Sequence, residues 1–336
     1  MDILSLNFQS EKQIILNFYD SLESSKIEEI PQILSNYCSK DLLWRGFHPF
    51  NEIRGIENLF SQFWQPLKNS FLNFQRRMDI FLAGYNTISG SEGVWVISMG
   101  HLMGLFDKPW LGIKETKKIG MLRYCEFCKV ENNKITEIAM FFDIPHFMLQ
   151  SGLKVFPVET GISLIQPGPL NNDGLMYEIQ DPNEGNKTSE IIEKMIRDLV
   201  IWKNFDKVSL KRELKKSWNE DMIWWGPTGI GASFTIDRYI EHHAQPFRKT
   251  FINRKFNGHI CRISEGTYGG FFGWPNLTLT PQKNFMGLKT FKKSSEMRVI
   301  DIYRRRGKKL AENWIFIDFL HFWKIQGIDI LKVQKV

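Results

Sequence analysis

An internal repeat constrains the fold of this chain more than any other feature of its sequence. Four short patterns from the first half return in the second half in the same order: Trp44-x-Gly46 as Trp224-x-Gly226, Gln65-Pro66 as Gln245-Pro246, Ser91-Glu92-Gly93 as Ser264-Glu265-Gly266, and Asp143-x-x-His146-Phe147 as Asp318-x-x-His321-Phe322. The offsets are 180 positions for the first two patterns (224 − 44), 173 for the third (264 − 91) and 175 for the last (318 − 143). An ordered repeat with small shifts indicates a duplicated domain. A site in one half is therefore expected in the other.

Length and composition agree with two domains. A chain of 336 residues predicts about two domains. We expect a first domain at 1–155, a connector at 156–186 and a second domain at 187–336. The connector contains Pro167-Gly168-Pro169 and Asp181-Pro182-Asn183, which are typical of loops on a protein surface. The 27 Phe and 11 Trp residues offer more ring surface than a packed core needs, and this suits a deep apolar pocket.

Neither a metal site nor a nucleic-acid surface is favoured. Cys125-x-x-Cys128 resembles a metal or redox motif, but it lies in an expected strand, where an odd separation sends two side chains to opposite faces. No second cysteine pair or histidine cluster completes a zinc site, so we expect buried thiols and no metal. The net charge of +7 is otherwise dispersed, and a glycine interrupts the densest basic run, 304–309, which indicates a hairpin turn.

The sequence also predicts where the protein is found. The segment Met1–Ser5 has neither a basic region nor an apolar run, so we expect no signal peptide. No apolar stretch is long enough to span a bilayer. Four cysteines are too few for a disulfide scaffold and fit a reducing compartment. We therefore expect a cytoplasmic protein that does not bind membranes.

Each half begins with helical patterns and continues with strand patterns. In the second half the helical spacing runs through Ile191, Ile192, Met195, Leu199 and Trp202, with Thr188 or Ser189 as the N-cap. Later helices at Ile56–Trp64 and Ile236–Ala244 are expected to end at Pro66 and Pro246. The expected strands are Val94–Leu102, Gly120–Glu131 and Lys134–Phe142, then His259–Ser264, Tyr268–Gly273, Met297–Arg305 and Leu310–Asp318. Helices followed by a meandering sheet indicate the α+β class.

An ordered set of motifs resembles the SnoaL-like polyketide cyclases of the nuclear-transport-factor-2-like superfamily. The second half carries Met297–Arg304, Glu312-Asn313-Trp314, Asp318, Trp224-x-Gly226-Pro227, Gly273-Trp274-Pro275 and Gln326-Gly327. The first half carries Trp44-x-Gly46, Gly112-Ile113, Asp143, Gln150 and Gly152, but has Ala139 where the second half has Trp314. The resemblance implies two tandem cone-shaped α+β barrels, each with N-terminal helices packed on a curved, mainly antiparallel sheet.

Asp318 and Asp143 are the first candidates for catalysis. Asp318 shares a strand face with Glu312, Trp314 and Phe316, and Asp143 ends the matching face of the first half. Burial at a pocket floor would raise the pKa of such an acid toward neutrality, as a general base requires. The resemblance implies that this acid moves protons in an intramolecular aldol closure. The alternative is a helix cap, because an apolar turn follows each Asp, and the sequence leaves both interpretations open.

Histidines and aromatic residues complete the candidate site. His101 and His259 lie on expected strands and are further candidates for catalysis, although a chance surface position is an equally simple interpretation. His146 and His321 are candidates for substrate binding, with a packing role favoured. The candidates for the pocket wall, with core packing as their alternative, are Trp44, Trp224, Trp225, Trp274, Trp314 and Phe316.

Two functions of different classes fit these features. The first is a cyclase or isomerase that moves protons on a hydrophobic, polyketide-like molecule, and the second is a protein that only binds an apolar ligand. No nucleotide-binding motif or serine nucleophile elbow is present, so we expect no cofactor. We expect the halves to pack as a pseudo-dimer within one chain and leave further oligomerisation open. We also expect Asp318 to matter more for turnover than Asp143, because the first half lacks the tryptophan.

Overall fold

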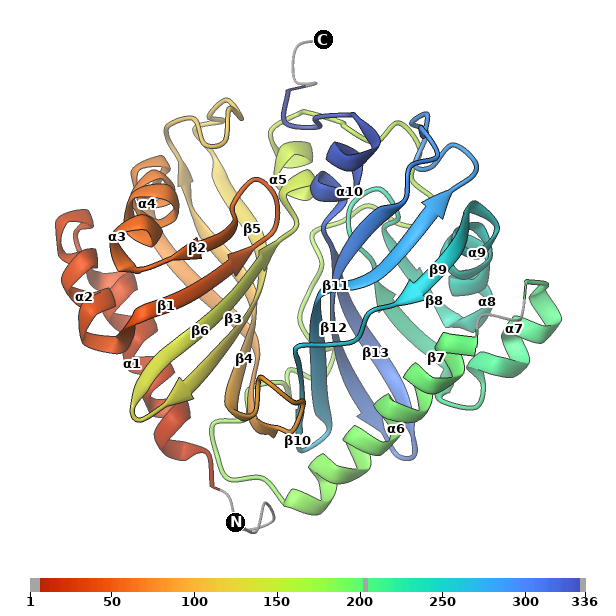
Figure 1. Ribbon diagram of the computed structural model, residues 1–336, viewed down its shortest axis with the longest axis horizontal. Coiled ribbons are helices and arrows are strands. Elements are labelled where there is room, and N and C mark those ends of the chain that lie inside the picture. The colour runs from red at the N-terminus through yellow and green to blue at the C-terminus, as the bar shows by residue number, and fades with distance from the viewer. Residues whose placement is uncertain (1–6, 202–204, 333–336) are drawn as a thin grey trace. The chain divides into compact units, whose positions relative to one another are not determined.

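Residues 7–201 and 205–332 are described by a computed structural model, in which the chain divides into two compact units. Unit 1 contains residues 7–155, 170–179 and 330–332, and unit 2 contains Phe156–Pro169 and Gln180–Asp329. Each unit is described by itself (Figure 1). Trp202 and Met1–Ser5, which entered the sequence analysis, lie outside the described residues. The packing of the halves as a pseudo-dimer stays a prediction.

Unit 1 has its helices on one face of a six-stranded sheet (Figure 1). Its helical elements are α1 (Gln9–Ser24), η2 (Ile27–Glu29), α2 (Ile30–Tyr37), α3 (Ile56–Leu59), η3 (Phe60–Trp64), α4 (Gln65–Ser70) and α5 (Ile144–Gln150). Its strands are β1 (Cys38–Gly46), β2 (Asn51–Arg54), β3 (Phe71–Asn86), β4 (Gly93–Phe106), β5 (Ile119–Glu131) and β6 (Lys134–Phe142). The strand order is β2-β1-β6-β5-β4-β3, and every pairing is antiparallel except that of β1 with β6.

Unit 2 has the same order of elements around a seven-stranded sheet. Its helical elements are α6 (Pro182–Ile201), α7 (Lys207–Leu214), α8 (Thr235–Tyr239), η4 (Ile240–Ala244), α9 (Gln245–Thr250) and α10 (Phe319–Gln326). Its strands are β7 (Trp218–Trp225), β8 (Ala232–Phe234), β9 (Phe251–Phe256), β10 (Cys261–Glu265), β11 (Tyr268–Pro281), β12 (Ser295–Arg306) and β13 (Lys309–Ile317). Both units therefore have the predicted α+β class, with helices on a mainly antiparallel sheet.

The strand register of the two sheets matches, as expected for a duplicated domain. The pair β5–β6 has a register shift between Lys129 and Val130, and β12–β13 has one between Arg304 and Arg305, which is 175 positions later. The single parallel pairing also recurs, with Trp44 opposite Ile138 in unit 1 and Trp224 opposite Asn313 in unit 2. These matches extend the repeat from short motifs to whole strands, so positions in the two units can be compared one by one.

The connector residues are divided between the two units. Phe156–Pro169 belongs to unit 2, where the carbonyl of Pro167 accepts a hydrogen bond from the Trp314 indole at 3.0 Å. Leu170–Ile179 belongs to unit 1. The remaining residues open α6, which begins at Pro182 and not at the N-cap expected from the sequence at Thr188 or Ser189. The segment thus packs within both units.

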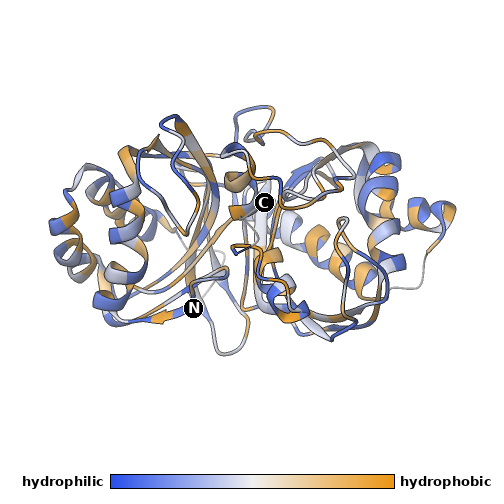
Figure 2. Ribbon diagram, turned by 90° about the horizontal axis from the view of Figure 1, so that it is seen from above, coloured by the Kyte–Doolittle hydropathy of each residue, from blue (hydrophilic) through white to orange (hydrophobic). Residues whose placement is uncertain are grey.

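Amphipathic helices explain the layered structure of each unit. In α1 the buried apolar residues include Ile15, Phe18 and Leu22, which recur at helical spacing and face the sheet. Figure 2 shows hydrophobic and hydrophilic residues alternating along the helices of both units. Pro66 and Pro246 do not end their helices as expected, because a π-helical turn, η3 or η4, precedes each proline and the chain continues into α4 or α9. Proline is tolerated in a first turn, where its missing N–H is not needed.

Several smaller expectations are met. Cys125 and Cys128 lie on β5 with both thiols buried. The basic run lies at a hairpin as expected, with the turn at Gly307, whose φ of +62° glycine adopts readily, although Arg304 and Arg305 belong to β12 and are buried, not solvated. Within the described part of the chain, no helix is both long enough and apolar enough to cross a membrane.

Candidate functional site

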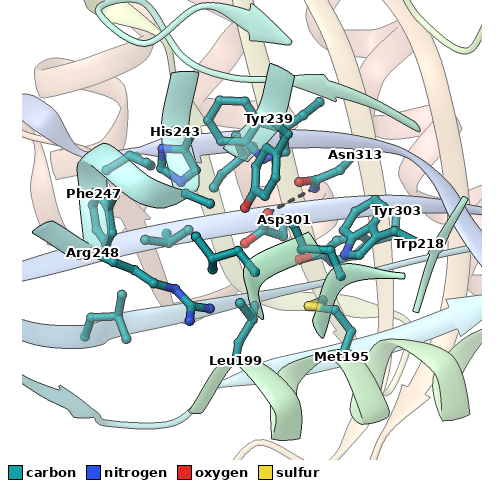
Figure 3. A pocket seen from close by; sticks show the side chains of 18 of the residues that line it. Met195, Leu199, Trp218, Tyr239, His243, Phe247, Arg248, Asp301, Tyr303 and Asn313 are labelled. Atoms are coloured by element: carbon teal, nitrogen blue, oxygen red, sulfur yellow. Dashed lines mark hydrogen bonds between the residues drawn. The ribbon is translucent and has the colours of Figure 1, made fainter. Parts of the chain in front are cut away.

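Unit 2 contains a cavity of about 130 Å³ between its sheet and its helices. The sheet side comes mainly from β12 and β13, and the helix side comes from α6, α7 and the run α8–η4–α9 (Figure 3). Most lining side chains are aliphatic or aromatic. The polar ones are Asp301, Asn313, Tyr239, Tyr303, His243, Arg248 and Arg254, together with the indoles of Trp218 and Trp224. An apolar cavity with a few convergent polar groups is the usual form of a small-molecule site.

Asp301 is the acid of this cavity. It lies on β12, has only 6% of its surface exposed, and accepts a hydrogen bond from Asn313 Nδ2 to its Oδ1 at 3.0 Å. Asn313 lies on the neighbouring strand β13 and also donates to the carbonyl of Ile302 at 3.0 Å, which fixes its orientation. The hydroxyl of Tyr303 forms a further hydrogen bond with Asp301. Two side chains therefore hold this carboxyl group in place.

Burial raises the pKa of Asp301 from its ordinary value of 3.8 to about 7. Loss of water around the carboxylate is the main cause, and the hydrogen bonds from Asn313 and Tyr303 lower the pKa by a smaller amount. A carboxyl group with a pKa close to neutrality exists in both protonation states at physiological pH. It can therefore accept and return a proton, which is what a general acid–base catalyst requires.

The helix side of the cavity contributes a tyrosine that points toward Asp301 and a neutral histidine that stacks on Trp224. Figure 3 shows the Tyr239 hydroxyl pointing toward Asp301, with His243 one helical turn further along. The His243 ring stacks on Trp224 with ring centroids 4.3 Å apart and an interplanar angle of 18°. Burial, and then the positive charge of Arg248, lower the pKa of His243 to about 3, so its imidazole is uncharged at neutral pH.

The repeated Trp-x-Gly motif has a packing explanation. A Cβ atom on Gly226 would lie 1.9 Å from a ring carbon of Trp224, and one on Gly46 would lie 2.2 Å from the ring of Trp44. Each indole ring therefore folds back over its own glycine. In unit 2 this places Trp224 in the cavity wall, beside His243.

Unit 1 has different side chains at the equivalent positions. Glu126 lies opposite Met140 and Asp301 lies opposite Ile315, so the two acids are equivalent at the offset of 175. At the same offset or the offset of 180, unit 1 replaces the other polar residues by apolar ones or cysteine: Tyr303 by Cys128, Asn313 by Ile138, Tyr239 by Leu59 and His243 by Phe63. These four polar side chains of unit 2 thus have no polar counterpart at the equivalent positions of unit 1.

The acid of unit 1, Glu126, forms an ion pair with Arg76. Arg76 Nη1 lies 2.7 Å from Glu126 Oε2, and both side chains are almost fully buried. The guanidinium group also lies over the rings of Tyr19, at 3.7 Å, and Tyr124, at 4.6 Å. Arg76 therefore fills the space beside Glu126. In unit 2 the residue equivalent to Arg76, 180 positions later, is Phe256.

Asp318 and Asp143 are helix N-caps. The Asp318 carboxylate accepts a hydrogen bond from the His321 backbone N–H at 3.0 Å, and Asp143 accepts one from His146 N–H at 3.1 Å. Asp318 Oδ2 also lies 3.3 Å from Arg298 Nη1, and neither aspartate lines the cavity described above. The capping interpretation from the sequence is therefore confirmed.

The prediction of which strand face forms the pocket is wrong. Side chains alternate along β13, and Asn313, Ile315 and Ile317 line the cavity. The aromatic face carrying Trp314 and Phe316 points to the other side of the sheet, where the Trp314 indole donates to Pro167. The sequence reasoning placed the pocket on the aromatic face, whereas the helices cover the aliphatic one.

The histidine candidates lie apart from the cavity. His101 is buried on β4, with Nδ1 3.6 Å from Asp79 Oδ2. His259 is not on a strand as expected, because β10 begins at Cys261, and its ring stacks on Phe271 with centroids 3.9 Å apart. His146 Nδ1 lies 3.3 Å from Gln150 Nε2. His321 Nε2 lies 3.3 Å from Glu296 Oε2.

Trp224 is the one predicted wall residue that lines this cavity. Trp44 holds the equivalent place in unit 1, where its ring lies 4.8 Å from Phe63. Trp225 packs edge-on against Phe234, and Trp274 lies under the guanidinium of Arg298 at 3.8 Å.

The sequence analysis missed Asp301, although a signal for it was present. An acidic residue stands in the middle of an apolar strand in both halves, as Glu126 between Cys125 and Phe127 and as Asp301 between Ile300 and Ile302. A buried acid at one position of a repeated strand needs a partner or a function. Comparing the halves at the offset of 175 would have found it.

No protein-family model matches the chain, and no curated protein matches it. Among solved structures, it is similar to a protein from Jannaschia sp. CCS1 named as a SnoaL-like polyketide cyclase, with 14% identity, a TM-score of 0.34 and coverage of 46% of this chain and 97% of that one. It is also similar to an NTF2-like protein from Burkholderia xenovorans LB400, with 11% identity, a TM-score of 0.32 and coverage of 42% of this chain and 97% of that one. A third similar structure is an LEH-like epoxide hydrolase of M. tuberculosis, with 14% identity, a TM-score of 0.30 and coverage of 42% of this chain and 88% of that one.

Proposed function

We propose that unit 2 is an enzyme that moves a proton on a small hydrophobic carbonyl compound, in an isomerisation or an aldol-type ring closure. The observation that carries this proposal is Asp301, a buried carboxyl group in an apolar cavity whose pKa is about 7. Its carboxylate takes a proton from the carbon next to the carbonyl group, so a C–H bond breaks and an O–H bond forms. The resulting enolate then attacks a second carbonyl or regains the proton at another carbon.

The other polar groups of the cavity have roles in this scheme. Asn313 orients the carboxyl group, because it donates to Asp301 and is itself fixed by Ile302. Tyr239 and Tyr303 are hydroxyl donors beside the acid and can stabilise the enolate oxygen. The volume of about 130 Å³ suits a compact molecule, since an apolar cavity of about 150 Å³ accommodates benzene.

Exchange of carbon-bound protons in D2O tests this function without knowledge of the natural substrate. The probe is cyclopentanone, a compact cyclic ketone of about the size of benzene, and its exchange is followed by proton NMR. We expect the wild type to accelerate exchange over buffer, and Asp301→Asn to lower the enzymatic rate by about 10²–10⁴-fold. The matched control is Arg76→Met/Glu126→Gln, which removes the equivalent acid of unit 1 with its partner and should leave the rate unchanged.

The alternative function is binding of an apolar ligand without chemistry, which the mainly apolar lining of the cavity favours. In that case cyclopentanone would raise the melting temperature of the wild type without faster exchange. That outcome, or an equal rate in wild type and Asp301→Asn, would overturn the enzyme proposal.

A further inference from the structure

Two arginines line the same cavity as Asp301. The lining residues with charged side chains are Arg248 on α9, Arg254 on β9 and Asp301 on β12. In Figure 3, Arg248 and Asn313 lie on opposite sides of the pocket, with Asp301 between them. The cavity therefore has a basic side and an acid–base group at its centre.

The basic side of the cavity is formed by the guanidinium groups of Arg248 and Arg254. Arg248 is 4% exposed and forms a two-point ion pair with Glu213, at 2.5 Å from Nη2 and 3.3 Å from Nη1. Arg254 is half-buried and donates to the carbonyl of Leu199 at 3.3 Å. Burial, and then the positive charge of Arg248, lower the pKa of Arg254 to about 10, which still leaves it protonated at neutral pH. This side of the cavity therefore holds two protonated guanidinium groups, of which Arg248 is paired with Glu213.

Comparison with unit 1 indicates that the fold does not require this arrangement. At the offset of 180, Arg248 corresponds to Lys68 and Arg254 to Phe74. The Lys68 amine donates to the backbone carbonyls of Leu22, at 2.8 Å, and Glu23, at 3.2 Å. The same strand and helix thus form in unit 1 without an arginine at the position of Arg254. The arginine of that strand is Arg76, two positions further along, and it pairs with the acid Glu126. Unit 2 instead has Phe256 at the position of Arg76 and its strand arginine at Arg254.

We propose that the substrate of unit 2 carries a carboxylate group, which binds Arg254 with Arg248 beside it and places the carbonyl-bearing part of the molecule at Asp301. This inference rests on the proposed function and deepens it, since the substrate becomes a compact hydrophobic keto acid. Guanidinium groups bind carboxylates through charge-assisted hydrogen bonds that carboxamides cannot match. An anion would also offset the unfavourable proximity of the two buried cations.

Calorimetric titration with butanoate and butanamide tests the inference. These probes have almost the same shape and differ in charge. We expect the wild-type protein at about pH 7 to bind the carboxylate about tenfold more tightly than the amide. Arg254→Met should abolish the preference, so that both probes bind about equally. Arg254→Lys should retain part of the preference because the positive charge remains. The control is Arg262→Gln, which alters an arginine on β10 that pairs with Glu193 at 3.1 Å and does not line the cavity.

The outcomes separate this inference from the proposed function. Asp301→Asn should keep the tenfold preference even though it loses proton exchange, because the carboxylate binds on the basic side. Equal binding of the two probes, a preference that survives Arg254→Met, or no binding of butanoate at about 10 mM would each overturn the inference. A carboxylate preference in a protein without exchange activity would support the anion site and reject the enzyme proposal.

Discussion

Replacing Asp301 with asparagine should stabilise the protein at high pH and leave its stability at low pH nearly unchanged. The side chains have almost the same shape, and the asparagine Oδ1 can still accept the hydrogen bond from Asn313. The two proteins differ in the charge that appears on Asp301 as the pH rises. Stability against pH therefore reports directly on the environment of this carboxyl group.

The size of the effect follows from the pKa shift. One pKa unit corresponds to 1.36 kcal/mol, so a change from 3.8 in the unfolded chain to about 7 in the folded state corresponds to roughly 4 kcal/mol. The folded state holds this proton more tightly than the unfolded chain does. Its contribution to stability is therefore complete below about pH 4 and is lost as the pH rises through about 7. Asp301→Asn has no such loss, so its advantage should grow to about 4 kcal/mol by about pH 8.5.

Urea unfolding followed by tryptophan fluorescence at several pH values measures this difference. The matched control is Glu126→Gln in unit 1. This substitution should lower the free energy of unfolding, because it removes the anionic partner of buried Arg76. That variant should lose about 3–5 kcal/mol. A difference between wild type and Asp301→Asn that does not vary with pH would refute the reasoning. So would an Asp301→Asn protein that is less stable than wild type at about pH 8.5.

Three further predictions concern neighbouring residues. Asn313→Leu removes a hydrogen bond that lowers the pKa of Asp301, so the midpoint of the pH–rate profile for exchange should move upward, and an unchanged midpoint would contradict the role of Asn313. Gly226→Ala places a Cβ 1.9 Å from the Trp224 ring and should cost about 1–3 kcal/mol in urea unfolding, whereas a neutral effect would contradict the packing explanation of the motif. Asp318→Asn keeps an N-cap residue and leaves the cavity intact, so exchange should stay within about tenfold of wild type; a loss of about 10²-fold or more would favour Asp318 over Asp301 as the acid.

Much of the fold could be predicted because the repeat and the order of helices and strands are visible in the sequence. The long strand β3 was missed because its middle, with Gln75, Arg76, Arg77 and Asp79, is too polar to show a strand pattern. The π-helical turns were missed as well. Proline usually limits a helix, and the sequence gives no sign that one extra residue in the preceding turn lets the helix continue.

The site was harder to predict because strand alternation gives two faces without saying which one the helices cover. On β13 the aromatic face looked like a pocket wall, and Asp318 at its end looked like a catalytic acid. The aliphatic face, with Asn313, Ile315 and Ile317, is the one that lines the cavity. Tyr239 and His243 come from α8 and η4, which are far from β12 in the chain, so only the folded structure could place them in the same cavity as Asp301.

The most direct test of the central claim is the pKa of Asp301 itself. Carbon-detected NMR of the side-chain carboxyl groups can follow its titration, with the resonance assigned by its loss in Asp301→Asn. We predict a midpoint at about 7, because burial outweighs the hydrogen bonds from Asn313 and Tyr303. A midpoint near the ordinary value of 3.8 would mean that Asp301 is a permanent carboxylate at neutral pH, and it would contradict the proposed role of this residue in proton transfer.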